Sequence, residues 1–345
     1  MSLDALQLFI GGVMLAALLI YTLTGGADFG GGVWDLFARG PRADAQRRAI
    51  AEAIGPIWEA NHVWLIVVIV LMFVAFPVAF AAISTNLHIP LLLVLFGIVL
   101  RGSAFVFRAY DPQSSGLDRR WSLVFSVASA ATPVMLGVVL GAVCSDKILF
   151  RPTTGELIPD FVGAWLTPFP FAVGGFTLAL FAFLAAVYLT IEADDPELRD
   201  DFRRRALYSA VASGVFAFVA LGLAAREAPR IFEALTQTSW SIPLQLATAA
   251  CAVGTMVALA RKADRLARLL AIGQVTLIVV GFGAAQYPFV LAPRLTIYNE
   301  TAPMSVLWPV SIALAIGTVL IAPAFAYLYL VFKRRRVVER SEAVK

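Results

Sequence analysis

Long apolar runs separated by short polar segments make up almost the whole chain. A helix needs about 20 apolar residues to cross the ~30 Å hydrocarbon core of a bilayer. No run alternates apolar and polar residues with the period of two that outer-membrane barrel strands show. We therefore expect an all-α integral membrane protein with nine transmembrane helices, at residues 5–27, 54–82, 87–108, 122–144, 164–190, 207–225, 241–260, 268–292 and 305–332.

The composition agrees with this pattern. Hydrophobic residues make up 60% of the 345 residues and charged residues only 14%, and the mean hydropathy is +0.83. So few charges could not keep the chain dissolved in water, which excludes a disordered chain, a nucleic-acid-binding protein and a free cytoplasmic enzyme. Cys144 and Cys251 each stand alone in an apolar run, so neither a disulfide framework nor a zinc site is expected.

The basic residues indicate the orientation of the chain in the membrane. Of 27 Lys and Arg residues, 21 fall in every second segment between the spans, five fall in the other segments, and Arg101 lies inside the third span. Basic residues concentrate on the cytoplasmic side of a membrane. This alternation predicts that the N-terminus lies outside and that the tail at 333–345 is cytoplasmic.

The connections are short, so no soluble domain is expected and the chain forms one polytopic membrane domain, 1–345. Neighbouring helices joined by short loops pack antiparallel. Gly11-Gly12 and Gly174-Gly175 open similar long apolar runs, which suggests an internal repeat. We predict a first four-helix bundle at 1–144, a second at 164–292, a ninth helix at 305–332 and the tail at 333–345.

Three charged side chains lie within the first three spans or directly beside them. Asp28, Glu59 and Arg101 all fall in the cytoplasmic third, at roughly 8–14 Å from that end if each residue adds about 1.5 Å. A lone charge in lipid costs several kcal/mol, so such residues face protein or water and are candidates for function. One interpretation is a structural ion pair in which Arg101 compensates one acid. The other is a proton-uptake path, because the second carboxylate then needs a proton or water.

Histidine is scarce. Only His62 and His88 are present, and a side chain that packs in the core or at the rim explains each of them more simply than a haem ligand does. A chain that holds several haems by itself is therefore disfavoured.

Six short motifs stand out along the chain. They are Gly26-Ala27-Asp28-Phe29-Gly30-Gly31-Gly32, Gly55-Pro56-Ile57-Trp58-Glu59-Ala60-Asn61-His62-Val63-Trp64-Leu65, Phe76-Pro77-Val78, Leu100-Arg101-Gly102-Ser103-Ala104-Phe105-Val106-Phe107-Arg108, Tyr287-Pro288-Phe289-Val290 and Thr296-Ile297-Tyr298-Asn299. With these motifs the chain resembles subunit II of the cytochrome bd-type quinol oxidases of bacterial respiratory chains. The likeness covers the whole length, and it is strongest in the first third of the chain.

The resemblance implies a heterodimer in which a homologous subunit I carries haems b and d and the quinol site, while this chain binds no haem. The complex would oxidise quinol, reduce oxygen to water and take the protons from the cytoplasm. Whether the quinol is ubiquinol or menaquinol, and whether a small single-span subunit attaches, is left open. Lipid surrounds the complex, and no nucleic acid takes part.

The resemblance also implies roles for individual residues. Asp28, Glu59 and Arg101 match positions associated with proton delivery or with stabilising the haems of the partner. Trp58 and Arg101 match positions that contact a structural quinone in some members. Two residues depart from the family pattern, since Glu59 stands where aspartate is common and His62 where glutamine is common. The main alternative is a secondary transporter, since kinked helices, internal repeats and buried charges are typical of transporters as well.

Overall fold

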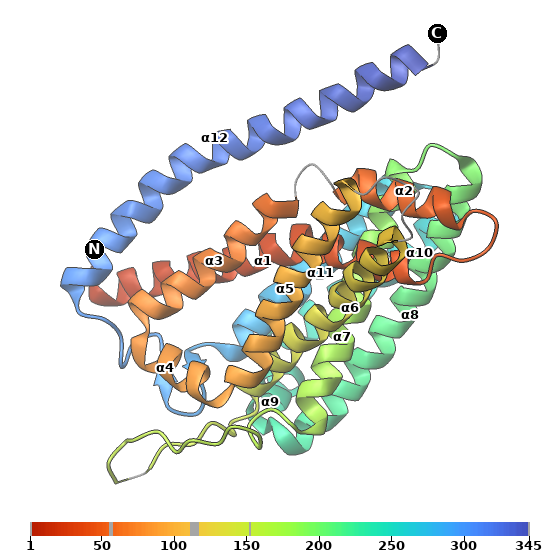
Figure 1. The fold of residues 1–345 in the computed structure, drawn as a ribbon. Helices are drawn as coiled ribbons and strands as arrows, with labels where there is room; N and C mark the ends of the chain where they lie inside the picture. Colours follow the sequence, from red (N-terminus) through yellow and green to blue (C-terminus); the bar gives the residue numbers. More distant parts are fainter. Residues whose placement is uncertain (1, 55–57, 111–116, 152, 344–345) are drawn as a thin grey trace.

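The computed structural model describes residues 2–54, 58–110, 117–151 and 153–343, and Figure 1 shows their arrangement. Helices make up nearly all of it. The elements are α1 (Leu3–Leu36), α2 (Ala43–Ile54), α3 (Trp58–Ala75), α4 (Pro77–Asn86), α5 (His88–Tyr110), α6 (Leu117–Cys144), α7 (Pro168–Glu192), α8 (Pro196–Glu227), α9 (Pro229–Gln237), α10 (Ser241–Ala260), α11 (Asp264–Gln286), β1 (Phe289–Leu291), β2 (Leu295–Thr296) and α12 (Met304–Ala343).

Eight of the described helices are long and apolar enough to cross a membrane: α1, α5, α6, α7, α8, α10, α11 and α12. A ninth span is obtained if α2 and α3, which meet at an angle of 55°, count as one bent span. The predicted second span, 54–82, is not one helix. Phe76 leaves the helical conformation and Pro77, which has no backbone N–H to donate, begins α4.

Two short amphipathic helices and one hairpin were not expected from the apolar runs. Helix α2 buries Gln46, Ile50 and Ile54, which recur every four residues and therefore share one face. Helix α9 lies at the opposite end of the bundle, where it buries Ile231. Strands β1 and β2 form a small antiparallel hairpin after α11. The prediction of an all-α protein is therefore correct except for these five strand residues.

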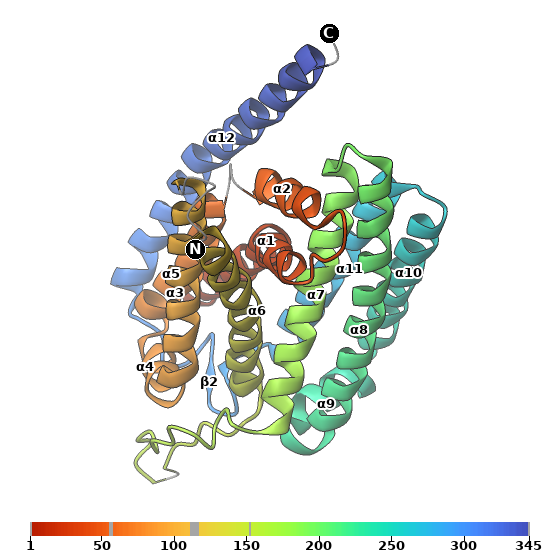
Figure 2. The ribbon, with the colours of Figure 1, turned by 45° about the vertical axis from the view of Figure 1, so that its right-hand side comes forward.

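Helix α1 lies at the centre of the molecule. Figure 2 shows it between α3, α5 and α6 on one side and α7, α8, α10 and α11 on the other, and it contacts α3, α6, α7 and α11. Glycines bring the helix backbones close together, as small residues do in membrane bundles. A Cβ on Gly30 would lie 2.0 Å from the Phe181 carbonyl oxygen, and a Cβ on Gly32 would lie 2.2 Å from Ser129 Oγ. The division into two four-helix bundles stays a prediction.

The ends of two helices differ from the predicted spans. Helix α12 continues without interruption through most of the predicted tail, and in Figure 1 its C-terminal part diverges from the other helices. Helix α8 starts at Pro196, so the acidic and basic residues at 196–205, expected in a solvated loop, form its first turns. Large apolar side chains cover the outside of the helices, as a surface in contact with lipid or another membrane subunit requires; they include Phe73 on α3 and Phe96 on α5.

Candidate functional site

Asp28 lies in the interior of the bundle on α1. The residue is only 6% exposed, and the side-chain amide of Asn61 on α3 donates a hydrogen bond to its Oδ2. Helix α1 passes through the glycine-rich segment around Asp28 without a break. The carboxyl group is therefore held at a fixed depth by its own helix and by one neighbouring side chain.

Arg101 on α5 is buried next to this carboxyl group. Only 1% of the residue is exposed, and its guanidinium carbon lies 4.8 Å from the ring centre of Phe29 and 5.4 Å from that of Phe125. Arg101 and Asp28 interact electrostatically, but no direct ion pair joins them within the part of the chain that the structure describes. Aromatic faces attract a guanidinium through their quadrupole. Ring contacts rather than a carboxylate therefore hold Arg101 in place.

Glu59 does not join Asp28 and Arg101. Its side chain is exposed in the first turn of α3. Residues two apart in a helix point to nearly opposite sides, so Glu59 and Asn61 cannot both face α1, and Asn61 is the one that does. The predicted cluster of two carboxylates and one guanidinium is thus found for Asp28 and Arg101 only. Glu59 therefore lies outside this buried pair, and its place in a proton path stays a prediction.

A second buried carboxylate was not recognised in the sequence. Asp35 is 2% exposed near the end of α1. Arg108 Nη1 on α5 donates to its Oδ1 at 3.1 Å, and Ser126 Oγ on α6 lies 2.7 Å from its Oδ2. The side chain of Arg108 is 19% exposed, so the pair reaches the surface through Arg108, while Asp35 itself is covered.

Each carboxylate on α1 lies beside one arginine on α5. This gives two layers, Asp28 with Arg101 and Asp35 with Arg108. Asp28 and Asp35 are seven residues apart on α1, and Arg101 and Arg108 are seven apart on α5. Seven residues make two turns, so each pair shares a helix face and is separated by roughly 10 Å. This spacing is the signal in the sequence that could have revealed Asp35. It was overlooked because Asp35 lies past the predicted end of the first span.

Hydroxyl groups lie beside the two layers. Ser129 Oγ lies against the α1 backbone at Gly32, between Asp28 and Asp35. Tyr21 lies seven residues before Asp28 on the same face of α1. We call this set the polar network: Tyr21, Asp28, Asp35, Arg101, Arg108, Ser126 and Ser129.

Several buried atoms of the polar network lack a hydrogen-bond partner among the described residues. They are Tyr21 Oη, Ser129 Oγ, and Nε and Nη2 of Arg101. Asn61 Oδ1, beside Asp28, also lacks a partner among the described residues. Buried polar groups are nearly always paired, so a concentration of unpaired ones calls for an explanation beyond packing. These unpaired groups are available to form hydrogen bonds with a group that carries a proton.

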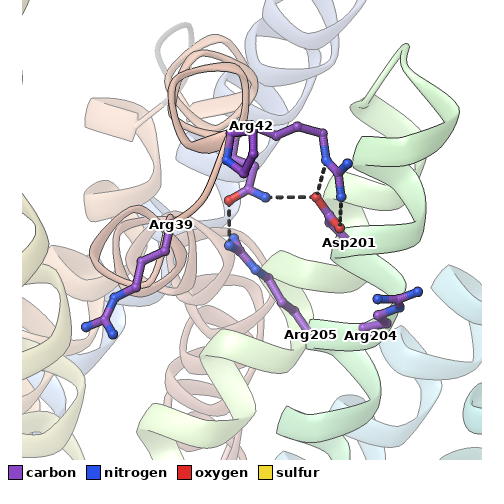
Figure 3. Close-up of a pocket in the computed structure, with 7 residues that line it drawn as sticks. Arg39, Arg42, Asp201, Arg204 and Arg205 are labelled. Atoms are coloured by element: carbon purple, nitrogen blue, oxygen red, sulfur yellow. Dashed lines mark hydrogen bonds and ion pairs between the residues drawn. The ribbon is translucent and has the colours of Figure 1, made fainter.

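Arginines gather at the end of the bundle where α1 finishes. We call this the arginine-rich end; it comprises the connection 37–42, α2, residues 196–205 of α8, the connection 261–263 and the start of α11 at Asp264. A pocket of about 300 Å³ opens there, and Figure 3 shows Arg39 and Arg204 pointing away from each other at its sides.

Ion pairs tie the arginine-rich end together. Arg42 binds Asp201 through Nε and Nη2, at 2.9 and 2.8 Å, and Glu197 through Nη1 at 2.7 Å. The hydrogen bond to Asp201 and the charge of Asp201 raise the pKa of Arg42 above its ordinary value. Arg205 donates to Gln46 Oε1 at 2.6 Å. These contacts attach the α1–α2 connection and α2 to α8.

A quinone site built from Trp58 and Arg101 does not fit the described residues. Arg101 is covered by Phe29 and Phe125 and presents almost no surface to a ligand, and the side chain of Trp58 lies outside the described residues. Among the residues that the structure describes, no group of three or more His, Cys, Asp or Glu side chains could hold a metal ion.

The fold and the polar network define a multi-span helical membrane protein with ionisable groups in its interior. The sequence matches the family described as cytochrome bd terminal oxidase subunit II over residues 6–332. The chain therefore belongs to the cytochrome bd terminal oxidase subunit II family, and the resemblance seen in its motifs is confirmed.

Three curated relatives support this assignment. A cytochrome bd ubiquinol oxidase subunit 2 of Bacillus subtilis is 27% identical over 219 residues, which cover 61% of either chain. The cytochrome bd-I ubiquinol oxidase subunit 2 of Escherichia coli is 27% identical over 188 residues, 52% of this chain and 48% of the relative. The chain thus spans about half to three fifths of these relatives. A putative cytochrome bd menaquinol oxidase subunit II of Bacillus subtilis is 22% identical over 94% of both chains.

A solved structure shows that the fold is shared. The bd oxidase from Geobacillus thermodenitrificans contains a chain that superimposes with a TM-score of 0.79 and is 20% identical, with 95% of this chain and 98% of that chain covered. At this level of identity the likeness concerns the fold.

Proposed function

We propose that this chain is the haem-free subunit of a bd-type terminal oxidase in a bacterial cytoplasmic membrane. In this complex it packs against a haem-bearing subunit I, stabilises it and carries protons from the cytoplasm toward the site of oxygen reduction. Family membership supports the assembly, since subunits of this family are named for quinol oxidases. The single observation that supports the proton role is the buried Asp28, which Asn61 holds next to Arg101.

The arginine-rich end faces the cytoplasm in this proposal. It collects basic residues from the segments that hold 21 of the 27 Lys and Arg residues, and such segments stay on the cytoplasmic side. The N-terminus is then outside and the end of α12 is cytoplasmic. The exposed Glu59 lies at the same end as Asp35, where it would meet protons from the cytoplasm.

The chemistry assigned to this chain is proton movement alone. Four protons and four electrons reduce one O₂ to two waters, and two quinols supply the electrons. Haems b and d in subunit I would carry those electrons and reduce oxygen. Asp28 takes up a proton as its carboxylate becomes a carboxylic acid and returns to the carboxylate when it passes the proton on.

Every observation that fits a secondary transporter fits an oxidase subunit equally well. Kinked and broken helices occur here, as at Pro77, but the family match over 6–332 is to an oxidase subunit. We therefore set the transporter aside. Whether the donor is ubiquinol or menaquinol is not decided, because the relatives include enzymes named for each.

Purification from native membranes tests the proposal. We expect a larger haem-containing polypeptide to accompany this chain in roughly equal amount, and the pair to consume oxygen when quinol is added. As a control, the chain expressed without any companion should show no haem absorbance. Recovery of this chain from native membranes without a haem-bearing companion would contradict the proposal and favour a transporter.

A further inference from the structure

The cytoplasmic proton supply needs a group between the arginine-rich end and Asp28. Asp28 is buried and lies two helical turns farther from the arginine-rich end than Asp35 does, so a proton from that end must cross the distance between them. Asp35 is the carboxylate on the same face of α1 that lies toward the arginine-rich end. The side chain of its partner Arg108 is partly exposed there.

We propose that Asp35 is the group through which protons pass from the arginine-rich end to Asp28, with the Ser129 hydroxyl between the two carboxyl groups. This inference rests on the proposed function and extends it. A proton from cytoplasmic water converts the Asp35 carboxylate to the acid. It then passes toward Asp28 through water that Ser129 Oγ binds, because this hydroxyl is hydrogen-bonded to neither carboxyl group. Each group returns to its starting form, so the chain itself undergoes no net change.

Three features of the geometry support this order. Ser129 Oγ lies against Gly32, at a level between the two carboxyl groups, and has no hydrogen-bond partner among the described residues. Ser126 Oγ can bind either Asp35 Oδ2 or the Ser122 carbonyl oxygen, at 2.7 and 2.8 Å, so its hydrogen bond can be exchanged. The matching layers place one arginine beside each carboxylate.

The simpler explanation is that Asp35 and Arg108 form a structural ion pair that only fixes α1 against α5. The two explanations make opposite predictions for conservative variants. D35N keeps the size of the side chain and an oxygen that accepts a hydrogen bond, but it cannot carry a proton. D35E keeps the carboxyl group but adds a methylene to a fully packed position. D35N also removes the charge that pairs with Arg108, so a structural role predicts that D35N lowers assembly, haem content and melting temperature. A proton role predicts slower turnover at unchanged haem content, which D35E partly restores.

The test compares these variants in the assembled complex with subunit I. We expect D35N to lower quinol-driven oxygen consumption about tenfold or more at unchanged haem content, because a positioned proton-transfer group contributes this much or more to a rate. D35E should keep more activity than D35N. The matched control is D44N on α2, since Asp44 lies at the same end with its side chain 92% exposed; it should stay within about twofold of the unchanged protein.

The outcomes separate this inference from the proposed function. If D28N slows turnover and D35N does not, or if D35N is more active than D35E, the assignment of Asp35 is wrong and the proposed function stands. If D28N also leaves turnover unchanged, the proton role itself fails. Should D35N not assemble, S129A decides, because it leaves the Asp35–Arg108 pair intact: a several-fold slower turnover supports the inference, and an unchanged rate overturns it.

Discussion

Replacing Asp28 by asparagine should slow quinol-driven oxygen consumption roughly tenfold to a hundredfold while the haem content of the complex stays unchanged. Asparagine has the size of aspartate and can still accept the hydrogen bond from Asn61, so packing is preserved. It cannot bind and release a proton, and loss of a positioned proton-transfer group has effects of this size or larger. Oxygen-electrode rates, normalised to haem absorbance, measure the change.

The control for this substitution lies on the same helix. Asp4 is exposed near the start of α1, far from the polar network, and D4N should leave the rate within about twofold. D28E restores the carboxyl group and should recover part of the activity. If D28N turned over at the unchanged rate in a fully assembled complex, Asp28 would be a structural residue and the proton role would be withdrawn.

Substituting Gly30 by alanine should destabilise the protein by about 1–3 kcal/mol, the usual cost of forcing a methyl group into a packed core. The new Cβ would lie 2.0 Å from the Phe181 carbonyl oxygen and 2.5 Å from its carbon. Both are backbone atoms of α7, so they cannot rotate away as a side chain would, and the helices must separate. A lower melting temperature of the purified complex in detergent is the expected observation.

Gly12 provides the comparison for Gly30. It lies on the same helix, and a Cβ placed there would meet no atom within 4 Å. G12A should therefore melt at or slightly above the temperature of the unchanged protein, since alanine is the better helix former. Equal melting temperatures for G30A and G12A would show that α1 and α7 are less tightly packed than the structure indicates.

The helices could be predicted well because their signal is local. An apolar run of sufficient length specifies a membrane helix whatever surrounds it, and the apolar helices of the structure lie close to the predicted runs. Helices α2 and α9 were missed because amphipathic segments carry a balanced composition that hydropathy does not detect. The early start of α8 was missed for a related reason. Its charged first turns contact α2 and α11, through pairs such as Arg203–Asp264, and a single sequence does not reveal such contacts.

The candidate site was predicted only in part. Asp28 and Arg101 were found because a charge in an apolar run is conspicuous. Glu59 was equally conspicuous, but the helix face decides which residue of α3 points inward, and that residue is the uncharged Asn61. Asp35 is 2% exposed and Arg101 is 1% exposed. Asp35 was nevertheless missed, because it lies past the predicted end of the first span. Depth in the membrane can be read from a sequence; the side of a helix that meets its neighbour depends on the other helices.

The central position of α1 also constrains how the molecule is built during synthesis. Helix α1 is synthesised long before some of its neighbours: Leu15 packs within 2.6 Å of where a Cβ would lie on Gly283 of α11, and Gly11 lies beside Ile297. Those partners are made about 270 residues later. Until they arrive, one side of α1 has no protein to cover it. Insertion of single spans can proceed in chain order, but the interior closes only when nearly the whole polypeptide is in the bilayer.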